Sequence, residues 1–270
     1  MDWQRTGILG RSHVKMVSMD ATSTARKIVI GDVHGQYDGL MHLLGIIAPR
    51  NDDQLCFVGD LIDRGPKSAQ VVDFVMHSPY QCLLGNHERM LLDILHEGQV
   101  LQQPLQAWLF SGGQTTLVSY QDFYGEPGIP HAHFDWLRSL PLHIDWGDYW
   151  IVHAGVDPTL PLEAQGVQQC CWIRDPFHSF PQRYFADKTI VTGHTITFTL
   201  PGVEPGQIAR GPGWMDIDTG AYHPRSGWLT GVDLTQEVVY QVNVYRSETR
   251  IVPLAELAVS IVPEAIAGRF

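Results

Sequence analysis

The first half of the chain repeats one pattern of hydrophobic and polar positions three times. A short apolar run ends in a polar cluster that contains glycine, and a stretch with helical spacing of apolar residues follows. The apolar runs, at residues 27–30, 55–58 and 81–84, are typical of buried strands. We expect helices after them, from Tyr37 to Pro49, from about Pro66, and from the 85–88 cluster to about Glu97.

Strand, loop and helix in this order predict βαβ units and a largely parallel sheet. After helices between residues 101 and 140, broken at 111–113 and 124–130, strand-like runs alternate with Gly and Pro turns. We expect these strands at 149–152, 189–192, 214–217, 228–234 and 237–244. Because no linker separates the halves, we expect one domain over residues 27–270, preceded by a loosely ordered leader, residues 1–26.

Polar side chains follow the expected strands at their carboxyl ends, where such sheets bind ligands. Six side chains share this placement: Asp32, His34, Asp60, Asn86, His153 and His194. Asp32 and His34 are two positions apart, so in an extended segment both leave the same face. Carboxylate, imidazole and amide groups suit manganese, iron or zinc. One aspartate beyond a neighbouring strand can bridge two such ions, which ~3.5–4 Å apart would hold a phosphoryl group and activate a shared water.

Three further polar residues in these loops supply what metal ions cannot. His87 is the candidate general acid for the leaving group, a contribution typically worth ~10²–10⁴ in rate. Asp63 can hydrogen-bond His87 and fix its tautomer. Arg64 offers a planar fork for phosphate oxygens.

Simpler structural explanations exist for several of these residues. Asp32, Asp60 and Asn86 can be turn formers or helix caps, but caps alone would not explain three similar clusters at one sheet edge. Glu88 is read as a helix first-turn carboxylate or a residue that supports a ligand. The single Asp218-Thr219-Gly220 lacks the second carboxylate of an aspartic protease and is expected at a strand end near the site. The tryptophans, including Trp108 and Trp172, are expected to serve packing, and Trp172 is a candidate for the pocket lining.

Five blocks resemble the signature of the calcineurin-like metallophosphoesterases and stand in the family's order. They are GDVHG (31–35), GDLIDRG (59–65), GNHE (85–88), HAG (153–155) and GHT (193–195). The Asp-Arg-Gly in the second block resembles the phosphoprotein phosphatase branch. The resemblance implies an α/β (α+β) fold, a β-sandwich of mixed sheets flanked by helices, with a dinuclear site at its edge.

The resemblance also implies a role for each residue of these blocks. It places Asp32 and His34 on one ion, Asp60 between the ions, and Asn86, His153 and His194 on the other. It makes His87 the proton donor, Asp63 its partner and Arg64 a phosphate clamp, with Asn86 and His87 also facing the phosphate. Trp172-Ile173-Arg174 resembles the Trp-x-Arg segment of small phage and bacterial protein phosphatases, which suggests Arg174 as a second clamp. A structural arginine bonded to loop carbonyls is the alternative.

The sequence motifs indicate the type of reaction more clearly than the substrate. GNHE, GHT and Trp-x-Arg favour a phosphatase of phosphoserine or phosphothreonine proteins, with phosphotyrosine as a further option, that works by direct attack of a metal-bridging hydroxide. Symmetrical bis(5'-nucleosyl)-tetraphosphatases are the alternative, because HAG is common in them, although they usually carry GNHD. A third hypothesis, an inactive scaffold of the same fold, requires lost ligands, whereas this sequence retains them all.

The composition of the chain argues against some classes of binding partner. A net charge of −11 argues against a protein that follows a nucleic-acid backbone. The four cysteines, Cys56, Cys82, Cys170 and Cys171, are expected to be buried thiols in a reducing cytosol. With no apolar run long enough for a membrane and no signal-like N-terminus, we expect a cytoplasmic enzyme, with a monomer compatible with the sequence and manganese as the preferred ion.

Overall fold

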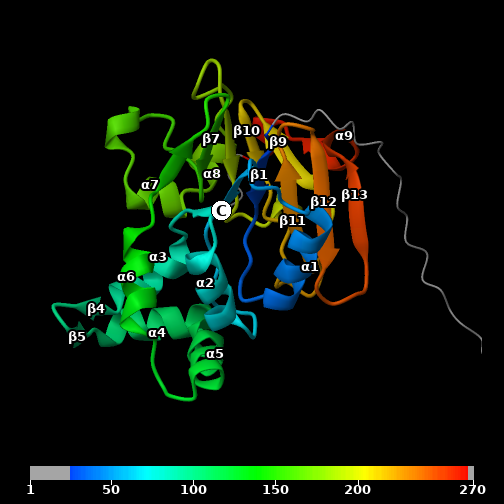
Figure 1. Ribbon diagram of the computed structural model, residues 1–270. Helices are drawn as coiled ribbons and strands as arrows, with labels where there is room; N and C mark the ends of the chain where they lie inside the picture. The colour runs from blue at the N-terminus through cyan, green and yellow to red at the C-terminus, as the bar shows by residue number, and fades with distance from the viewer. Residues whose placement is uncertain (1–24, 267–270) are drawn as a thin grey trace, which may run out of the picture.

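The computed structural model describes residues 25–266, in which two six-stranded sheets are flanked by helices (Figure 1). The first sheet has the order β13 (Thr249–Pro253), β12 (Val238–Asn243), β11 (Trp228–Asp233), β1 (Lys27–Ile30), β2 (Gln54–Phe57) and β3 (Gln81–Cys82). The second has the order β14 (Ala258–Ser260), β9 (Ile208–Gly211), β10 (Trp214–Asp216), β8 (Thr189–Thr192), β7 (Tyr149–Val152) and β6 (His143–Asp145). This arrangement confirms the expected sandwich of mixed sheets.

Both faces of the central strands are apolar, which explains why the sequences of these strands are continuously hydrophobic. In β1, Val29 belongs to the layer between the sheets, together with Val191 of the second sheet. Ile28 and Ile30 point the other way and pack in a separate cluster with Leu40 of helix α1. The alternation of side chains along a strand therefore supplies both the sandwich interior and the contact with the outer helices.

Helices cover the outer faces and build a separate group at one end of the sandwich. Helix α1 packs on β11 and β12, while at the lower left of Figure 1 α2 contacts α5 and α6, and α3 contacts α4 and α6. The α-helices are α1 (Tyr37–Ile47), α2 (Ser68–His77), α3 (Asn86–Asp93), α4 (Gln102–Trp108), α5 (Gln114–Tyr124), α6 (His131–Ser139), α7 (Val167–Trp172), α8 (Asp175–His178) and α9 (Leu254–Leu257). A π-helical turn, Leu109–Gly113, joins α4 to α5, and 3-10 turns lie at Leu162–Ala164, Thr197–Thr199 and Pro263–Ala265.

Strand directions agree with the sequence only in part. β1, β2 and β3 are parallel, as the βαβ pattern predicts. However, β11 pairs antiparallel with β1, and β12 and β13 continue antiparallel, so the sheet is mixed and not largely parallel. In the second sheet β7, β8 and β10 run parallel, with antiparallel β6 and β9 at their flanks. The short strands β6, β9, β13 and β14 were not expected.

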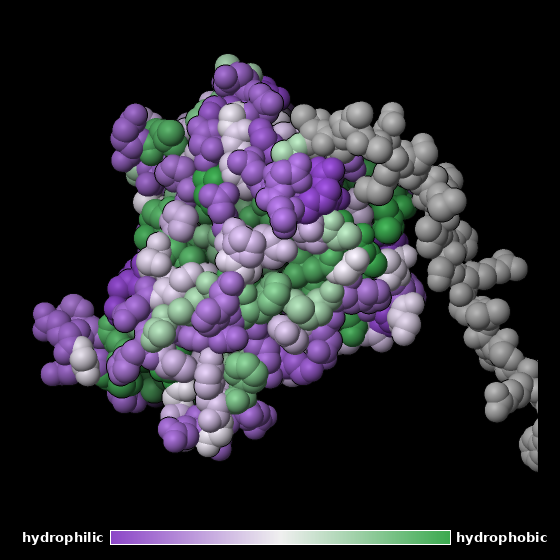
Figure 2. Space-filling view, in the orientation of Figure 1, coloured by the Kyte–Doolittle hydropathy of each residue, from purple (hydrophilic) through white to green (hydrophobic). Residues whose placement is uncertain are grey.

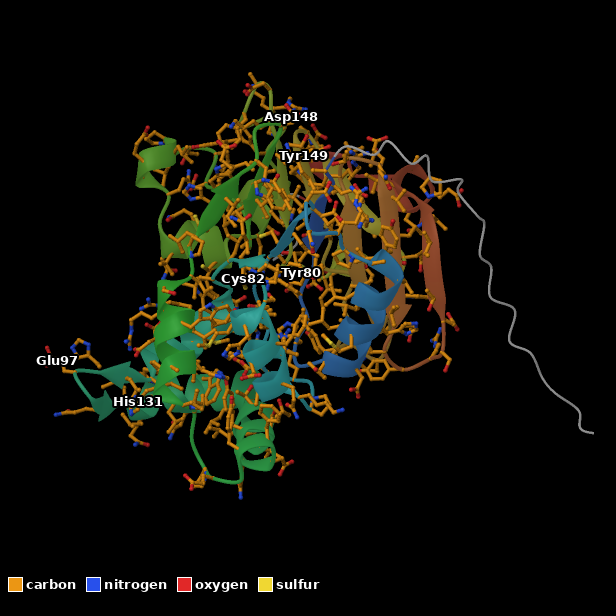
Figure 3. All side chains as sticks on the ribbon, viewed as in Figure 1. Tyr80, Cys82, Glu97, His131, Asp148 and Tyr149 are labelled. Carbon is orange, nitrogen blue, oxygen red and sulfur yellow. The ribbon has the colours of Figure 1, made fainter. Side chains whose placement is uncertain are left out.

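The expected helix through Glu97 is wrong. Helix α3 ends at Asp93, and the chain then forms a hairpin of β4 (Leu95–His96) and β5 (Gln99–Val100). Glu97 and Gly98 both have positive φ, 51° and 77°, as a tight two-residue hairpin turn requires. Figure 3 shows Glu97 at the tip of this hairpin, and Figure 2 shows hydrophobic residues beside it at the lower left.

The expected leader, residues 1–26, lies outside the described residues except at its end. There Arg26 is 2% exposed and anchored: its guanidinium donates to Asp53 at 2.6 and 3.0 Å and to the carbonyls of Ile47 and Ala48. All four cysteines are buried thiols, as expected. Between residues 25 and 266 no helix combines the length and apolar character needed to span a bilayer.

We predict that Asp53→Asn lowers the free energy of unfolding by about 2 kcal/mol, because one oxygen that accepts from arginine becomes a donor. Although burial opposes the shift, hydrogen bonds from Arg26 and Arg50 hold the pKa of Asp53 well below its usual range. A depressed folded-state pKa stabilises the protein above the unfolded pKa, ~4, and this stabilisation is lost as the pH falls toward the folded value. Urea unfolding at pH 7 and pH 3 should show the difference between the two proteins shrinking at pH 3.

The matched control for this prediction is Asp52→Asn, because the side chain of Asp52 is 60% exposed. It should change the unfolding free energy by only a few tenths of a kcal/mol. An equal loss in both variants would show that the Arg26–Asp53 contact does not anchor the chain.

Candidate metal centre

The two sheets bring their polar strand ends to one place. The loops after β1, β2 and β3 of the first sheet meet those after β7 and β8 of the second. The six residues of these loops that the sequence singled out are all buried, with exposed fractions of 6% or less: Asp32, His34, Asp60, Asn86, His153 and His194.

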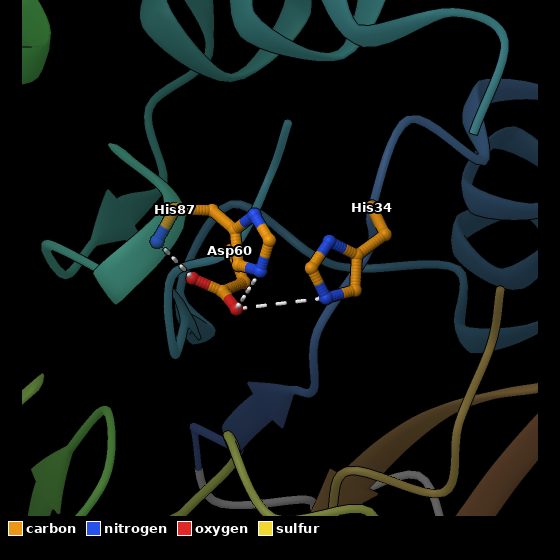
Figure 4. A group of neighbouring side chains, drawn as sticks. All are labelled: His34, Asp60 and His87. Atoms are coloured by element: carbon orange, nitrogen blue, oxygen red, sulfur yellow. Dashed lines mark hydrogen bonds and ion pairs between the residues drawn. The ribbon is translucent and has the colours of Figure 1, made fainter. Parts of the chain in front are cut away.

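Asp60 lies at the middle of this arrangement. Its Oδ2 is 3.5 Å from Nε2 of His34 and 3.9 Å from Nε2 of His87, and its Oδ1 is 3.4 Å from Nε2 of His153. Figure 4 shows the rings of His34 and His87 converging on the carboxylate. Two groups of potential ligand atoms therefore share Asp60, one with His34 and His87, the other with His153 and His194. A carboxylate common to two groups has the position that a bridging ligand needs.

The atoms around Asn86 are suited to bind a cation. Nδ1 of His153 lies 3.0 Å from the carbonyl of Val58 and must donate to it, which leaves Nε2 as an acceptor. That Nε2 is 3.0 Å from Oδ1 of Asn86, and the same oxygen is 2.8 Å from Nδ1 of His194. Acceptor atoms that converge in a buried site repel one another, and a divalent ion among them removes the repulsion.

Ionisation states fit the same conclusion. Burial lowers the pKa of His34, His153 and His194, which favours the neutral form of the imidazole that a metal ion binds. Burial alone would raise the pKa of Asp60, but the imidazoles of His153, His87 and His34 hold it well below its usual range. Both shifts, an acidic Asp60 and weakly basic imidazoles, favour the forms of these groups that bind a metal ion.

Asp32 lies against the loop of His194. Both of its carboxylate oxygens accept from the backbone N–H of His194, at 3.2 and 3.1 Å. Burial and the charges of Asp218 and Asp60 raise the pKa of Asp32 well above its usual range, since three buried carboxylates repel one another. Bound cations would offset the repulsion among these carboxylates. Asp32 is outside the two tight ligand groups, so its role as a ligand stays a prediction.

His87 and Asp63 form a buried pair beside Asp60. Nδ1 of His87 is 2.6 Å from Oδ2 of Asp63, which leaves Nε2 directed toward the centre. The indole N–H of Trp108 and the hydroxyl of Thr116 also donate to Asp63. The sequence suggested only packing for Trp108 and nothing for Thr116. The two residues lie 45 and 53 positions after Asp63, and no local motif links residues so far apart. Together these donors fix the carboxylate that orients His87.

Arg64 reaches the centre from the same loop. Its Nη1 donates to Nε2 of His34 at 2.9 Å, and its guanidinium lies 4.2 Å above the ring of Tyr222. The ring of Tyr222 also packs edge-on against His34, with centroids 4.8 Å apart. Cation–π contact limits the rotamers of an arginine that faces the site. The sequence did not indicate Tyr222, which follows the Asp218-Thr219-Gly220 segment.

Arg174 bonds to the loop that carries His194, as expected for an arginine with a structural role. Its Nη1 donates to the carbonyl of His194 at 3.1 Å and to the hydroxyl of Thr195 at 2.9 Å. These bonds place the guanidinium at the His194 side of the centre, and contact with phosphate stays a prediction. Trp172 is 37% exposed, and its ring centroid lies 6.5 Å from that of His194, so it borders the site.

Glu88 supports the loop that carries Asp60. Its two oxygens accept the backbone N–H groups of Asp60, Leu61 and Ile62 at 2.7–3.2 Å, and that of Gly85 at 3.0 Å. The side chain is fully buried, and burial together with the charge of Asp60 raises its pKa to about 8. Glu88 thus caps helix α3 and positions the central carboxylate.

The loops of the centre hold unusual backbone geometry. Five non-glycine residues have φ between 44° and 71°: His34, Asp60, Asp63, Arg64 and His194. Left-handed conformations of this kind cost about 1–3 kcal/mol each and persist where the surroundings fix them, often at functional sites. Glycine is required at close approaches, since a Cβ on Gly85 or Gly193 would lie 2.2 or 2.0 Å from a carboxylate oxygen of Asp60 or Asp32.

We predict that Glu88→Gln weakens metal binding about 10- to 100-fold, because its amide NH₂ would face backbone donors and release the Asp60 loop. The apparent dissociation constant for Mn²⁺, measured by titration of the purified protein, checks this. Glu97→Gln is the control, since Glu97 is exposed at the hairpin tip. Equal Mn²⁺ affinity for Glu88→Gln and the control would disprove the supporting role.

Comparison with known proteins agrees with this geometry. The chain is 34% identical over 168 residues to the symmetrical bis(5'-nucleosyl)-tetraphosphatase of Legionella pneumophila, covering 59% of this chain and 56% of the relative. Other bacterial relatives carry the same name, and the chain spans about half the length of the curated relatives it matches.

Solved structures share the fold. A crystal structure provisionally assigned as a diadenosine tetraphosphatase has a TM-score of 0.61 at 21% identity and covers 82% of this chain and 94% of its own. A cold-active protein-tyrosine phosphatase of a psychrophilic Shewanella has a TM-score of 0.52 at 18% identity, over 85% and 80% of the two chains. Residues 25–221, more than half of the chain, match the family profile of the calcineurin-like phosphoesterases. With the sequence match, the sandwich and the buried centre in agreement, the chain belongs to the calcineurin-like phosphoesterase family.

Proposed function

We propose that this protein hydrolyses dinucleoside tetraphosphates symmetrically, releasing two nucleoside diphosphates. The observation that carries this proposal is the match to bacterial relatives named for that reaction, at 34% identity over 168 residues. The buried centre supports it, because a cluster of histidines around one shared carboxylate suits a reaction on phosphate. This reverses the order expected from the sequence, in which a protein phosphatase stood first.

Different residues of the site would bind the metal ions and the phosphate. Two divalent cations, when bound, would neutralise phosphate charge and lower the pKa of a water molecule. Asp60, His153 and Asn86 are placed to hold such ions, while Arg64, braced by Tyr222, binds phosphate oxygens that the ions leave free.

Proton transfer to the leaving group falls to His87. Asp63 accepts from Nδ1 of His87 at 2.6 Å, so a proton given to the leaving group comes from Nε2 of the imidazolium, which faces Asp60 and the centre. Because Trp108 and Thr116 hold Asp63 by three donor contacts, the imidazole keeps this orientation during a reaction. The arrangement suits general acid catalysis at an oxygen leaving group.

A protein phosphatase is the second candidate, favoured by the Trp-x-Arg segment. Trp172 is partly exposed beside His194, and Arg174 reaches the same loop, which together form a rim that an extended phosphopeptide can contact. An inactive scaffold fits less well, since the residues of the centre are complete and buried. Manganese as the native ion and a cytoplasmic location remain predictions.

We predict that the purified protein with Mn²⁺ converts diadenosine tetraphosphate to ADP alone, two per substrate. Chromatography of the products distinguishes this from asymmetric cleavage to ATP and AMP. A panel of phosphoserine, phosphothreonine and phosphotyrosine peptides should be cleaved at least about 100-fold less efficiently, a difference of ~3 kcal/mol in transition-state binding. Rapid release of phosphate from peptides with intact diadenosine tetraphosphate would overturn the proposal in favour of the second candidate.

We also predict that His87→Asn lowers the rate on phenyl phosphate by about 10²–10⁴, because this leaving group needs a proton. On p-nitrophenyl phosphate, whose leaving group is stable as an anion, the loss should be roughly tenfold or less. Comparing kcat for both substrates tests the assignment, with His77→Asn as the control because His77 is 65% exposed. Equal losses on the two substrates would exclude His87 as the acid.

A further inference from the structure

A second buried pair of titratable residues lies outside the metal centre, and the mechanism above does not use it. His178, at the end of helix α8, and Asp216, at the end of strand β10, are 1% and 0% exposed. Nε2 of His178 is 3.3 Å from Oδ2 of Asp216, and neither atom has a hydrogen-bond partner elsewhere among residues 25–266. Two such atoms in contact need a proton between them.

Hydrogen bonding on the other side of the ring determines which ring nitrogen keeps its proton when the imidazole is neutral. Nδ1 of His178 is 3.1 Å from the carbonyl of Arg174 and must donate to it, since a carbonyl only accepts. Burial lowers the pKa of His178 to about 4, while burial and the charge of Asp218 raise the pKa of Asp216 well above its usual range. Both shifts favour the arrangement in which the O–H of Asp216 donates to the neutral imidazole of His178.

This pair connects the backbone of Arg174 to the loops around the metal centre. The carbonyl of Arg174 accepts three bonds, from the backbone N–H groups of Phe177 and His178 and from the ring of His178. Oδ1 of Asp216 accepts from the backbone N–H of Asp218 at 3.0 Å. The edge-on packing of Trp214 against the ring of His178, with centroids 4.8 Å apart, further limits rotation of the imidazole.

The chain of contacts ends at the guanidinium of Arg174. With its backbone held by His178, Arg174 extends to the carbonyl of His194 and the hydroxyl of Thr195, at the rim of the centre. Helix α8 has only four residues and could not by itself fix this arginine. The buried pair ties the helix to strand β10 instead.

We propose that Asp216 and His178 are positioning residues, which hold Arg174 so that its guanidinium binds a phosphate oxygen of the substrate. The inference rests on the proposed function in one respect, namely that Arg174 contacts phosphate. It does not depend on which phosphate compound is the physiological substrate. Loss of the pair should therefore weaken binding of phosphate groups in general and leave the chemical step nearly unchanged.

The test is a double-mutant cycle between His178 and Arg174 in the Mn²⁺-loaded protein. KM and kcat for p-nitrophenyl phosphate and the inhibition constant of inorganic phosphate are measured for His178→Phe, Arg174→Ala and the double variant. His178→Phe should raise KM and the phosphate inhibition constant roughly 3- to 10-fold, as expected for a lost hydrogen bond, with kcat within about twofold. In the Arg174→Ala background the same substitution should have no further effect.

Asp216→Asn is the conservative control. Its amide can donate to Nε2 of the neutral imidazole and its oxygen can accept from Asp218, so the phosphate inhibition constant should stay within about twofold of the wild type. If His178→Phe fails to fold, as judged by thermal unfolding, His178→Phe with Asp216→Leu removes both polar partners at similar volume and replaces it in the cycle.

Two results would overturn the proposal: an unchanged phosphate inhibition constant in a folded His178 variant, or the same fold increase with and without Arg174. The proposed substrate is tested separately. If diadenosine tetraphosphate is not hydrolysed but the cycle shows full coupling on p-nitrophenyl phosphate, the positioning role stands and only the substrate assignment fails.

Discussion

The carboxylate of Asp60, buried where the two sheets meet, is the constraint on which the rest of the structure depends. A charge in this position is stable only if donors and imidazoles surround it, and three histidines from different loops do so. The carboxylate of Glu88 accepts backbone N–H groups of the Asp60 loop, and the backbone N–H of His87 donates to Asp60. Holding this one charged group therefore ties together loops from both sheets.

The centre also explains how an acidic protein can handle phosphate. The chain carries a net charge of −11, yet phosphate needs positive charge at the site. Burial and the charges of Asp218 and Asp60 raise the pKa of Asp32, and burial lowers the pKa of His153, so both groups gain from a bound cation. Positive charge then comes from bound ions and from Arg64, and no basic surface is required.

Reaction class and substrate choice rest on different parts of the molecule. We infer that the reaction depends on the buried residues at the strand ends. We infer that substrate choice depends on the rim, where Trp172, Tyr222 and Arg174 lie on loops and short helices. Such segments vary while the sheet stays constant, so a likeness in fold to both tetraphosphatase and tyrosine phosphatase structures does not by itself select a substrate.

The sequence by itself determined the apolar strands and the strand-end placement of the six candidate ligands, because these depend on local spacing and the period of a strand. The pairing of His87 with Asp63, 24 positions apart, was expected from the chemistry of the two side chains and from the family resemblance. It did not determine the hairpin after Asp93, the antiparallel strands that make both sheets mixed, or the roles of Trp108, Thr116 and Tyr222. Only the tertiary structure decided these, and it also paired His178 with Asp216. Their contacts join residues far apart in the chain, and no local pattern records which distant side chain will be the partner.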